Sequence, residues 1–197
     1  VHADLQEFIE THRLGRASGV QVGMNGGHCN PRIVFGTATA KDHIYNTPRA
    51  WYMYRYLDLD DAENHTPESD DIPWCLEPEH AVTVEDVDFL LGSHYEGTPY
   101  DPYGTQGTEE SRHRYRPIGI NRTGHMVAMQ IRPYAPAESR SIMWVSYGSG
   151  AFTTSAPFYA NVDDPPAYLR DTTPEVSPDC LFWTNPLIAT LAAAHGY

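Results

Sequence analysis

The sequence is poor in basic residues, and this shortage argues against several classes of partner. It holds 13 Lys and Arg against 26 Asp and Glu, which gives a formal net charge of -13 at pH 7. A chain with this balance repels phosphate backbones and anionic lipid surfaces. We therefore expect no nucleic-acid partner and no role at a membrane surface.

Cysteines and long apolar runs are also scarce. The three cysteines, Cys29, Cys75 and Cys180, lie far apart and form no CxxC pair, and an odd number cannot be fully paired within one chain. This pattern favours a reducing compartment, so we predict a cytoplasmic location. No segment reaches the roughly 20 apolar residues of a membrane span. The opening residues, VHADLQEF, lack the basic and apolar regions of a signal peptide.

Several motifs that mark metal, nucleotide or serine-hydrolase sites are missing. The ten histidines form no HxH, HExxH or HxxxH, and there is no GxSxG, P-loop or GxGxxG. Metal catalysis is therefore disfavoured, and we predict no cofactor. The Trp, Leu and Phe neighbours of Cys75 and Cys180 predict buried, unreactive thiols.

What is present suits one domain, or a large part of one. The chain has 197 residues with 41% hydrophobic content, enough for a sizeable core. Residue 1 is Val, and residues 4 to 14 already have a helical pattern with Asp4 as a plausible cap. We expect the sequence to be a fragment from the middle to later part of a longer protein.

Hydrophobic periodicity predicts a mixed α+β fold. Residues 121–132 and 141–147 have strand-like patterns separated by PYAPAES, a connection of hairpin length, so we predict that they pair antiparallel. Thr83 and Asp86 form a capping-box pattern at the start of a helix. The remaining predicted strands are 20–22 and 33–39, and the remaining predicted helices are 4–14, one after a turn within 43–59, and one starting at 185–186.

The strongest polar cluster is HYEGTPYD, residues 94–101, where the predicted helix ends. Loops that follow helices expose such groups, which makes the cluster a candidate binding site. The alternative is a structural turn in which Gly97 takes a positive φ and Asp101 binds nearby amides. The residues alone favour the turn.

Two further clusters carry candidate chemistry. Asn46, followed by Thr-Pro, could hold an amide donor rigidly over a cleft and stabilise an oxyanion, although an ordinary helix-entry cap explains it equally simply. Residues 112–116, RHRYR, form the only basic cluster. Arginine binds carboxylates in a bidentate manner, so a peptide carboxylate is a natural ligand, and pairing with the chain's own acids is the alternative.

Taken in order, these clusters resemble the PepD-like cysteine dipeptidases, a secernin-related family of N-terminal-nucleophile hydrolases. The resemblance rests on YNTPR, TVEDV, HYEGTPYD, RYRPI followed by NRTGHMVAMQIRP, and MWVSYGSGAFTTSAPFY, which together span residues 42–159. HYEGTPYD is the specific part of the match.

The resemblance implies an αββα sandwich with antiparallel sheets and a dipeptide substrate. The family's nucleophile is a mature N-terminal cysteine whose α-amino group acts as the base. Residue 1 here is Val, so we expect that cysteine upstream of this chain and expect the isolated chain to be inactive. Asn46 matches the family's oxyanion asparagine, and Arg116 matches its later arginine. Candidate substrate-binding residues are His94, Tyr95, Glu96 and Asp101.

Two other functions remain open at this stage. A non-catalytic, secernin-like binding protein would keep the fold without hydrolysis, and the residue that forms the mature N-terminus would distinguish it. A related amide acylase would share the mechanism and need a different pocket, which a panel of dipeptides and acyl amides would distinguish. Association into a homo-oligomer is also left open.

Overall fold

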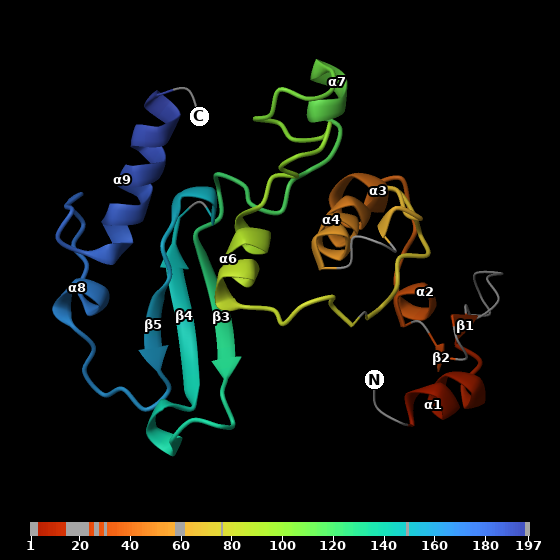
Figure 1. The fold of residues 1–197 in the computed structure, drawn as a ribbon, viewed down its shortest axis with the longest axis horizontal. Helices are drawn as coiled ribbons and strands as arrows, with labels where there is room; N and C mark the ends of the chain where they lie inside the picture. The colour runs from red at the N-terminus through yellow and green to blue at the C-terminus, as the bar shows by residue number, and fades with distance from the viewer. Residues whose placement is uncertain are drawn as a thin grey trace. The chain divides into compact units, whose positions relative to one another are not determined.

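The computed structural model describes residues 4–14, 24–25, 28–29, 31–57, 62–75, 77–148 and 150–195. It divides into two compact units, Val1–Ala81 and Val82–Tyr197, which we call the N-terminal and C-terminal units and describe separately. Figure 1 labels the helices and strands of both.

The N-terminal unit is mainly helical. Its elements are α1 (Leu5–Thr11), β1 (Met24–Asn25), β2 (His28–Cys29), α2 (Pro31–Phe35), α3 (Asp42–Tyr45) and α4 (Thr47–Leu57). The two short strands pair antiparallel. The helix predicted at 4–14 is confirmed over the shorter range of α1, residues 12–14 form a turn, and the side chain of Asp4 makes no capping hydrogen bond.

Aromatic side chains of α4 form the core of this unit. Trp51, Tyr52 and Tyr54 are buried, and the indole N–H of Trp51 donates to the carbonyl of His65 at 3.1 Å. Pro48 is the second residue of the helix, where its missing N–H breaks no helical hydrogen bond. The predicted helix after a turn within 43–59 is therefore confirmed.

The strand predicted at residues 33–39 is wrong. The structure has helix α2 at Pro31–Phe35, followed by non-regular backbone. Pro31 is the first helical residue, a position for which its fixed φ is suited. The apolar run Ile33–Phe35 is too short to show a period, so it does not separate a strand from a helical turn. The strand predicted at 20–22 lies outside the described residues.

The C-terminal unit combines helices with an antiparallel sheet. Its elements are α6 (Val84–Gly92), α7 (Glu109–Arg112), β3 (His125–Ile131), η2 (Ala137–Ser139), β4 (Ser141–Tyr147), η3 (Gly150–Phe152), β5 (Ala156–Tyr159), α8 (Ala167–Arg170) and α9 (Leu181–Ala194). The α+β prediction is confirmed at this level. The αββα sandwich stays a prediction.

The three strands form one sheet in the order β3-β4-β5 (Figure 1). His125 lies opposite Tyr147 at one end of the β3–β4 pair, and Val145 lies opposite Ala156 in the β4–β5 pair. The predicted antiparallel pairing of the two segments is confirmed. The first strand is shorter than predicted, because residues 121–124 form a turn.

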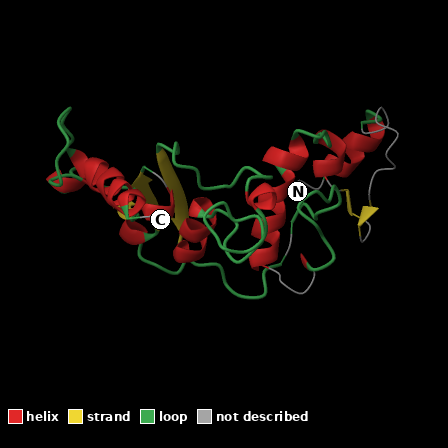
Figure 2. Ribbon diagram, turned by 90° about the horizontal axis from the view of Figure 1, so that it is seen from above, coloured by secondary structure: helices red, strands yellow, loops and turns green. Residues whose placement is uncertain are grey.

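Helices lie on both sides of this sheet (Figures 1 and 2). Met126, on one face, lines a cavity together with residues of α6. On the opposite face the ring of Tyr147 contacts that of Phe182 in α9, with centroids 5.5 Å apart. Near the other end of β3, Met129 is 84% exposed and Ile131 is 73% exposed. One end of the sheet is thus covered, and an apolar row remains exposed at the other.

Of two helix starts predicted from the sequence, one is confirmed and the other lies earlier in the chain than predicted. At α6 the capping box is confirmed, because the Thr83 side chain accepts from the Asp86 N–H and the Asp86 carboxylate accepts from the Thr83 N–H. The helix predicted to start at 185–186 instead starts at Leu181 and continues through Pro186. Leu181 is buried, so packing of the extra turn offsets the helical hydrogen bond that a proline cannot make.

Candidate functional site

The segment HYEGTPYD follows α6 directly and forms a tight turn. Its backbone takes two left-handed positions, Tyr95 with φ 74° and Gly97 with φ 73°. Gly97 is suited to this conformation because it has no Cβ, as the sequence predicted. Tyr95 is unexpected, because a bulky residue at positive φ is uncommon and strained. The surrounding contacts must hold it there.

Two carboxylates hold the side chain of His94 from opposite sides. Its Nδ1 lies 2.7 Å from Asp101 Oδ1, and its Nε2 lies 3.2 Å from Glu96 Oε1. The imidazole is 4% exposed, and the ring of Tyr103 meets it edge-on at 5.0 Å. Since carboxylates only accept, the doubly protonated ring is the form that donates to both.

The same two carboxylates bind the backbone of the turn. Glu96 Oε2 accepts from the hydroxyl of Ser93 at 2.6 Å and from the His94 N–H at 3.1 Å. Asp101 Oδ1 also accepts from the Tyr103 N–H at 2.9 Å, as the turn interpretation of the sequence predicted. Ser93 contributes to this network, and the sequence analysis missed it.

Tyr95 anchors the turn from inside. Its side chain is fully buried, and its hydroxyl donates to the carbonyl of Arg116 at 2.6 Å. The carbonyl of Tyr95 in turn accepts from the Thr98 hydroxyl at 2.8 Å. Tyr95 therefore links the turn to the basic cluster, and its backbone strain is balanced by burial and hydrogen bonds.

A cavity of about 370 Å³ opens beside this turn. Its lining residues combine acidic, apolar and backbone groups from α6, the turn, β3 and η3: Asp88, Phe89, Gly92, His94, Glu96, Met126, Gly150, Ala151 and Thr153. Of the predicted binding residues, His94 and Glu96 reach this cavity. The sequence analysis did not single out Asp88 or Met126, which come from elements far apart in the sequence.

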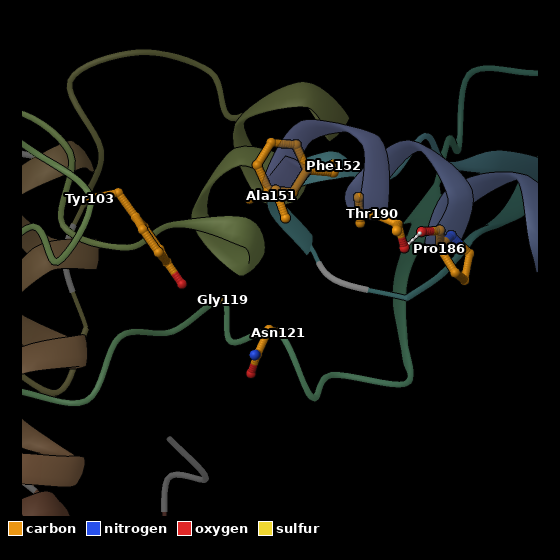
Figure 3. Close-up of a pocket in the computed structure, with 9 residues that line it drawn as sticks. Tyr103, Gly119, Asn121, Ala151, Phe152, Pro186 and Thr190 are labelled. Carbon is orange, nitrogen blue, oxygen red and sulfur yellow. Dashed lines mark hydrogen bonds between the residues drawn. The ribbon is translucent and has the colours of Figure 1, made fainter. Parts of the chain in front are cut away.

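A second cavity of about 510 Å³ lies against α9 (Figure 3). Its lining is mostly apolar or small: Tyr103, Gly119, Asn121, Ala151, Phe152, Pro186, Ala189, Thr190 and Ala193. In Figure 3 the hydroxyl of Thr190 donates to the carbonyl of Pro186. Ala151 lines both cavities, so η3 forms part of the wall of each.

Asn46 belongs to the N-terminal unit, between α3 and α4. Its side-chain amide is held by Asp42, whose Oδ1 accepts from Asn46 Nδ2 at 2.7 Å. The other oxygen of the buried Asp42 carboxylate accepts from the hydroxyls of Thr39 at 2.6 Å and Thr37 at 2.7 Å. These hydrogen bonds, Thr39 first, hold the pKa of Asp42 well below its ordinary value. The carboxylate therefore stays ionised and orients the amide.

The basic cluster, residues 112–116, contacts other residues of the C-terminal unit. Arg112 Nη1 donates to the carbonyl of Gly104 at 2.9 Å, and the guanidinium of Arg114 lies 5.4 Å from the ring centroid of Tyr115. Arg116 is half-buried and receives the Tyr95 hydroxyl on its carbonyl. The structure thus joins the backbone of Arg116 to Tyr95, which lies in the same turn as His94, Glu96 and Asp101. Asn46 belongs to the N-terminal unit.

The cysteines show one error in the sequence analysis. Cys180 is buried, as predicted, but Cys75 is exposed. The aromatic neighbour Trp74 is itself 55% exposed, so apolar neighbours in the sequence did not indicate burial. Cys29 lies in β2, and its side chain is outside the described part of the chain.

Within the described residues, no group of three or more His, Cys, Asp or Glu side chains is placed to hold a metal ion. The same residues include no helix with the length and apolar character needed to cross a membrane.

Comparison with known families assigns the chain to one of them. The whole chain, residues 1–197, matches the model of Peptidase family C69. The chain therefore belongs to peptidase family C69, which agrees with the resemblance to PepD-like dipeptidases seen in its motifs.

Curated relatives of the chain are named as dipeptidases. The chain is 52% identical over 195 residues to a dipeptidase of Bifidobacterium longum, covering 95% of this chain and 36% of that protein. It is 44% identical to a probable dipeptidase A of Streptococcus pyogenes, with 98% and 39% covered. It is 37% identical to dipeptidase A of Lactobacillus helveticus, with 97% and 41% covered. The chain thus spans less than half the length of these relatives.

Proposed function

We propose that the full-length protein is a dipeptidase, a hydrolase of the peptide bond in dipeptides. The observation that carries this proposal is the 52% identity to a protein named dipeptidase across 95% of this chain, within a peptidase family that matches every residue. The turn at residues 94–101, which is the specific part of the motif match, adds a cavity of ligand size beside it.

The nucleophile in this proposal is an N-terminal cysteine in a part of the full-length protein outside this chain. Its thiolate attacks the peptide carbonyl, and its own α-amino group accepts the proton. The tetrahedral intermediate then collapses to an acyl-enzyme with release of the second amino acid, and water releases the first. The chain of 197 residues alone is accordingly inactive.

Asn46 is the proposed oxyanion donor. An amide nitrogen carries two hydrogens, and Asp42 accepts one of them. The other remains available for the oxygen that becomes negative during attack, and the contact with Asp42 fixes its direction. Arg116 supplies positive charge, either to the thiolate or to the substrate carboxylate.

The proposed substrate-binding residues divide into two roles. His94 and Glu96 line the cavity and can contact the dipeptide. Tyr95 and Asp101 support them, because Tyr95 is fully buried and Asp101 holds the imidazole of His94. The bound dipeptide therefore meets side chains whose positions are already set.

The alternatives differ in chemistry at the same residues. A secernin-like binding protein would bind without turnover, and an amide acylase would prefer an acyl amide over a dipeptide. The names of the relatives favour the dipeptidase.

The test compares the full-length protein with variants of it and with the 197-residue chain. We expect release of amino acids from a dipeptide panel by the full-length protein, none by the short chain, and no comparable hydrolysis of acyl amides. Asn46→Ala should reduce kcat by about 10² to 10³, because an oxyanion donor acts mainly in the transition state. Arg116→Ala and Arg116→Lys should also be impaired, since Lys cannot replace a bidentate guanidinium.

Cys75→Ala is the matched control and should keep the wild-type rate. Thermal unfolding must first show that each variant is folded. Wild-type turnover in folded Asn46→Ala would refute its assignment, and a full-length protein that binds dipeptides without hydrolysing them would support the secernin-like alternative.

A further inference from the structure

The cavity against α9 is the larger of the two described above, and the proposed function does not use it. Its volume of about 510 Å³ is in the range of small-molecule sites. Among the described residues that line it, none carries a charge, and most are apolar or small. A neutral, apolar group is therefore the ligand chemistry that suits this cavity.

Helix α9 supplies one apolar wall. Pro186, Ala189 and Ala193 line the cavity at spacings of three and four residues, which places them on one side of the helix. The helix itself, Leu181–Ala194, includes no charged residue. In Figure 3, Tyr103 lies on the other side of the cavity from Pro186. The short alanine side chains leave the space between these walls open.

This wall is fixed by contacts outside the cavity. The side-chain amide of Asn185 donates to the carbonyl of Thr154 at 3.3 Å, which ties α9 to the segment after η3. Gly148, which follows β4, has φ 88°, and a Cβ built on it would lie 3.4 Å from Pro186 Cγ. The helix thus packs directly on that backbone. The cavity has its shape before a ligand binds, which lowers the entropy lost on binding.

The two cavities share a wall of glycine backbone. Gly119 lines the cavity against α9, whereas Gly92 and Gly150 line the cavity beside the turn. A Cβ built on Gly119 would overlap the carbonyl oxygen of Gly92, and one built on Gly150 would lie 2.7 Å from Gly92 Cα. Ala151 lines both cavities. The apolar cavity is therefore directly adjacent to the one that His94 lines.

We propose that the cavity against α9 binds an apolar side chain of the dipeptide, while the substrate main chain lies beside His94 and Glu96 in the neighbouring cavity. This proposal rests on the proposed dipeptidase function and names its substrate class, dipeptides that carry a large apolar residue. Tyr103 connects the two regions, because its ring lines the apolar cavity and lies 5.0 Å from the imidazole of His94.

Other occupants fit less well or are distinguished by experiment. A charged substrate side chain would lose its hydration in a cavity whose described lining offers no opposite charge. An apolar segment of the longer protein is the competing occupant, since the chain spans less than half the length of its relatives. Such a segment would leave no space for a substrate side chain.

The experiment uses the full-length enzyme and three dipeptides: alanyl-alanine, leucyl-alanine and alanyl-leucine. Ala189 is half-buried, and Ala189→Leu fills the cavity at a helical position where Leu is well tolerated. We expect kcat/KM to fall at least about 10-fold for one or both leucine dipeptides, because their side chain loses its space. Alanyl-alanine should stay within about twofold. The affected dipeptide identifies which substrate residue occupies the cavity.

Ala194→Leu is the matched control, because it makes the same substitution on the same helix at an exposed residue outside both cavities. It should leave all three substrates unaffected. Equal losses on all three dipeptides, or no loss, in folded Ala189→Leu overturn the side-chain site while leaving the dipeptidase function intact. A wild-type enzyme that hydrolyses no dipeptide overturns the proposed function and this inference with it.

A second measurement needs no variant. Leucine and asparagine have side chains of similar size, and only that of asparagine is polar. Wild-type enzyme should have a kcat/KM at least about 10-fold higher for leucyl-alanine than for asparaginyl-alanine, or for alanyl-leucine than for alanyl-asparagine, because burying the amide is unfavourable. Equal values within both pairs would contradict the proposal even if Ala189→Leu failed to fold.

Discussion

Tyr95 combines a strained backbone with a fully buried side chain, and its hydroxyl explains why the combination persists. The hydroxyl donates to the Arg116 carbonyl at 2.6 Å inside the protein. Tyr95→Phe keeps the ring and leaves that carbonyl with one donor fewer, so we expect the free energy of unfolding to fall by about 1–3 kcal/mol. Urea denaturation measures this fall in the free energy of unfolding.

Tyr134→Phe is the control for this change. Tyr134 is 86% exposed, so its hydroxyl is already hydrated and its loss should alter stability by less than about 0.5 kcal/mol. Equal effects of the two substitutions would mean that the hydrogen bond of Tyr95 does not support the turn.

Asp42 predicts an acid-side stability change. Its folded-state pKa is lowered by hydrogen bonds from Thr39 and Thr37, so the unfolded chain binds a proton at higher pH than the folded one. The contribution of Asp42 to the free energy of unfolding is complete above the ordinary pKa of 3.8. This contribution is lost as the pH falls below that value. Asp42→Asn should flatten the fall in Tm on the acid side of that pKa.

Asp163→Asn, in an exposed loop, is the comparison for the Tm titration. It should preserve the wild-type acid-side slope. A slope that is the same in Asp42→Asn as in wild type would show that Asp42 is not responsible.

Among the elements, α9 depends on a buried asparagine. Asn185 is fully buried; its Oδ1 lies 3.5 Å from the Thr154 N–H nitrogen, and its Nδ2 donates to the Thr154 carbonyl at 3.3 Å. This pair joins the helix to the loop before β5. Asn185→Ala should lower the free energy of unfolding of the 197-residue chain by about 1–2 kcal/mol, measured by urea denaturation.

Leu191→Ala, on the same helix, serves as the reference substitution. Leu191 is 61% exposed, and Ala is a strong helix former, so we expect little change. If both variants lost the same stability, the loss in Asn185→Ala could not be assigned to the contacts of Asn185 with Thr154.

The α9 helix also shows what the sequence could not reveal. Asn185 before Pro186 has the pattern of a helix start, and local rules favour that interpretation. The actual start at Leu181 depends on burial of Leu181 and on the Asn185–Thr154 pair, both of which are tertiary contacts. The 33–39 strand failed for a related reason, since a short apolar run takes the structure that its surroundings favour.

Elements with a complete local signal were predictable. The Thr83–Asp86 capping box defined α6, and the strand-like patterns in 121–132 and 141–147 defined the hairpin, with the first strand shorter than predicted. The site was predictable in part. The motif contained His94 and Glu96, but Asp88 became visible only once α6 and the turn were placed around one cavity.

At the scale of the whole molecule, the exposed apolar row on β3 bears on how the chain fits into a longer protein. Met129 and Ile131 point to the same face of the sheet, because strand side chains alternate. The αββα sandwich implied by the family resemblance would cover both faces of the sheet, one with helices and the other with a second sheet. We expect Met129→Glu to change the stability of the short chain by less than about 0.5 kcal/mol.

In the full-length protein the same substitution should be strongly destabilising, by several kcal/mol, because it buries an unpaired charge. Tyr134→Glu, in the connection after β3, should be mild in both proteins. Urea denaturation of the four variants tests this, and a mild effect of Met129→Glu in the full-length protein would contradict the sandwich at this face.

The order β3-β4-β5 has a kinetic consequence. Each strand pairs with its neighbour along the chain, and such short-range contacts close faster than distant ones. During synthesis the sheet can therefore form on the ribosome once residue 159 has emerged, before any later segment exists to cover Met129 and Ile131. In that interval the nascent chain presents an apolar surface beside an unpaired strand edge, the combination that chaperones bind and that aggregates when they are absent.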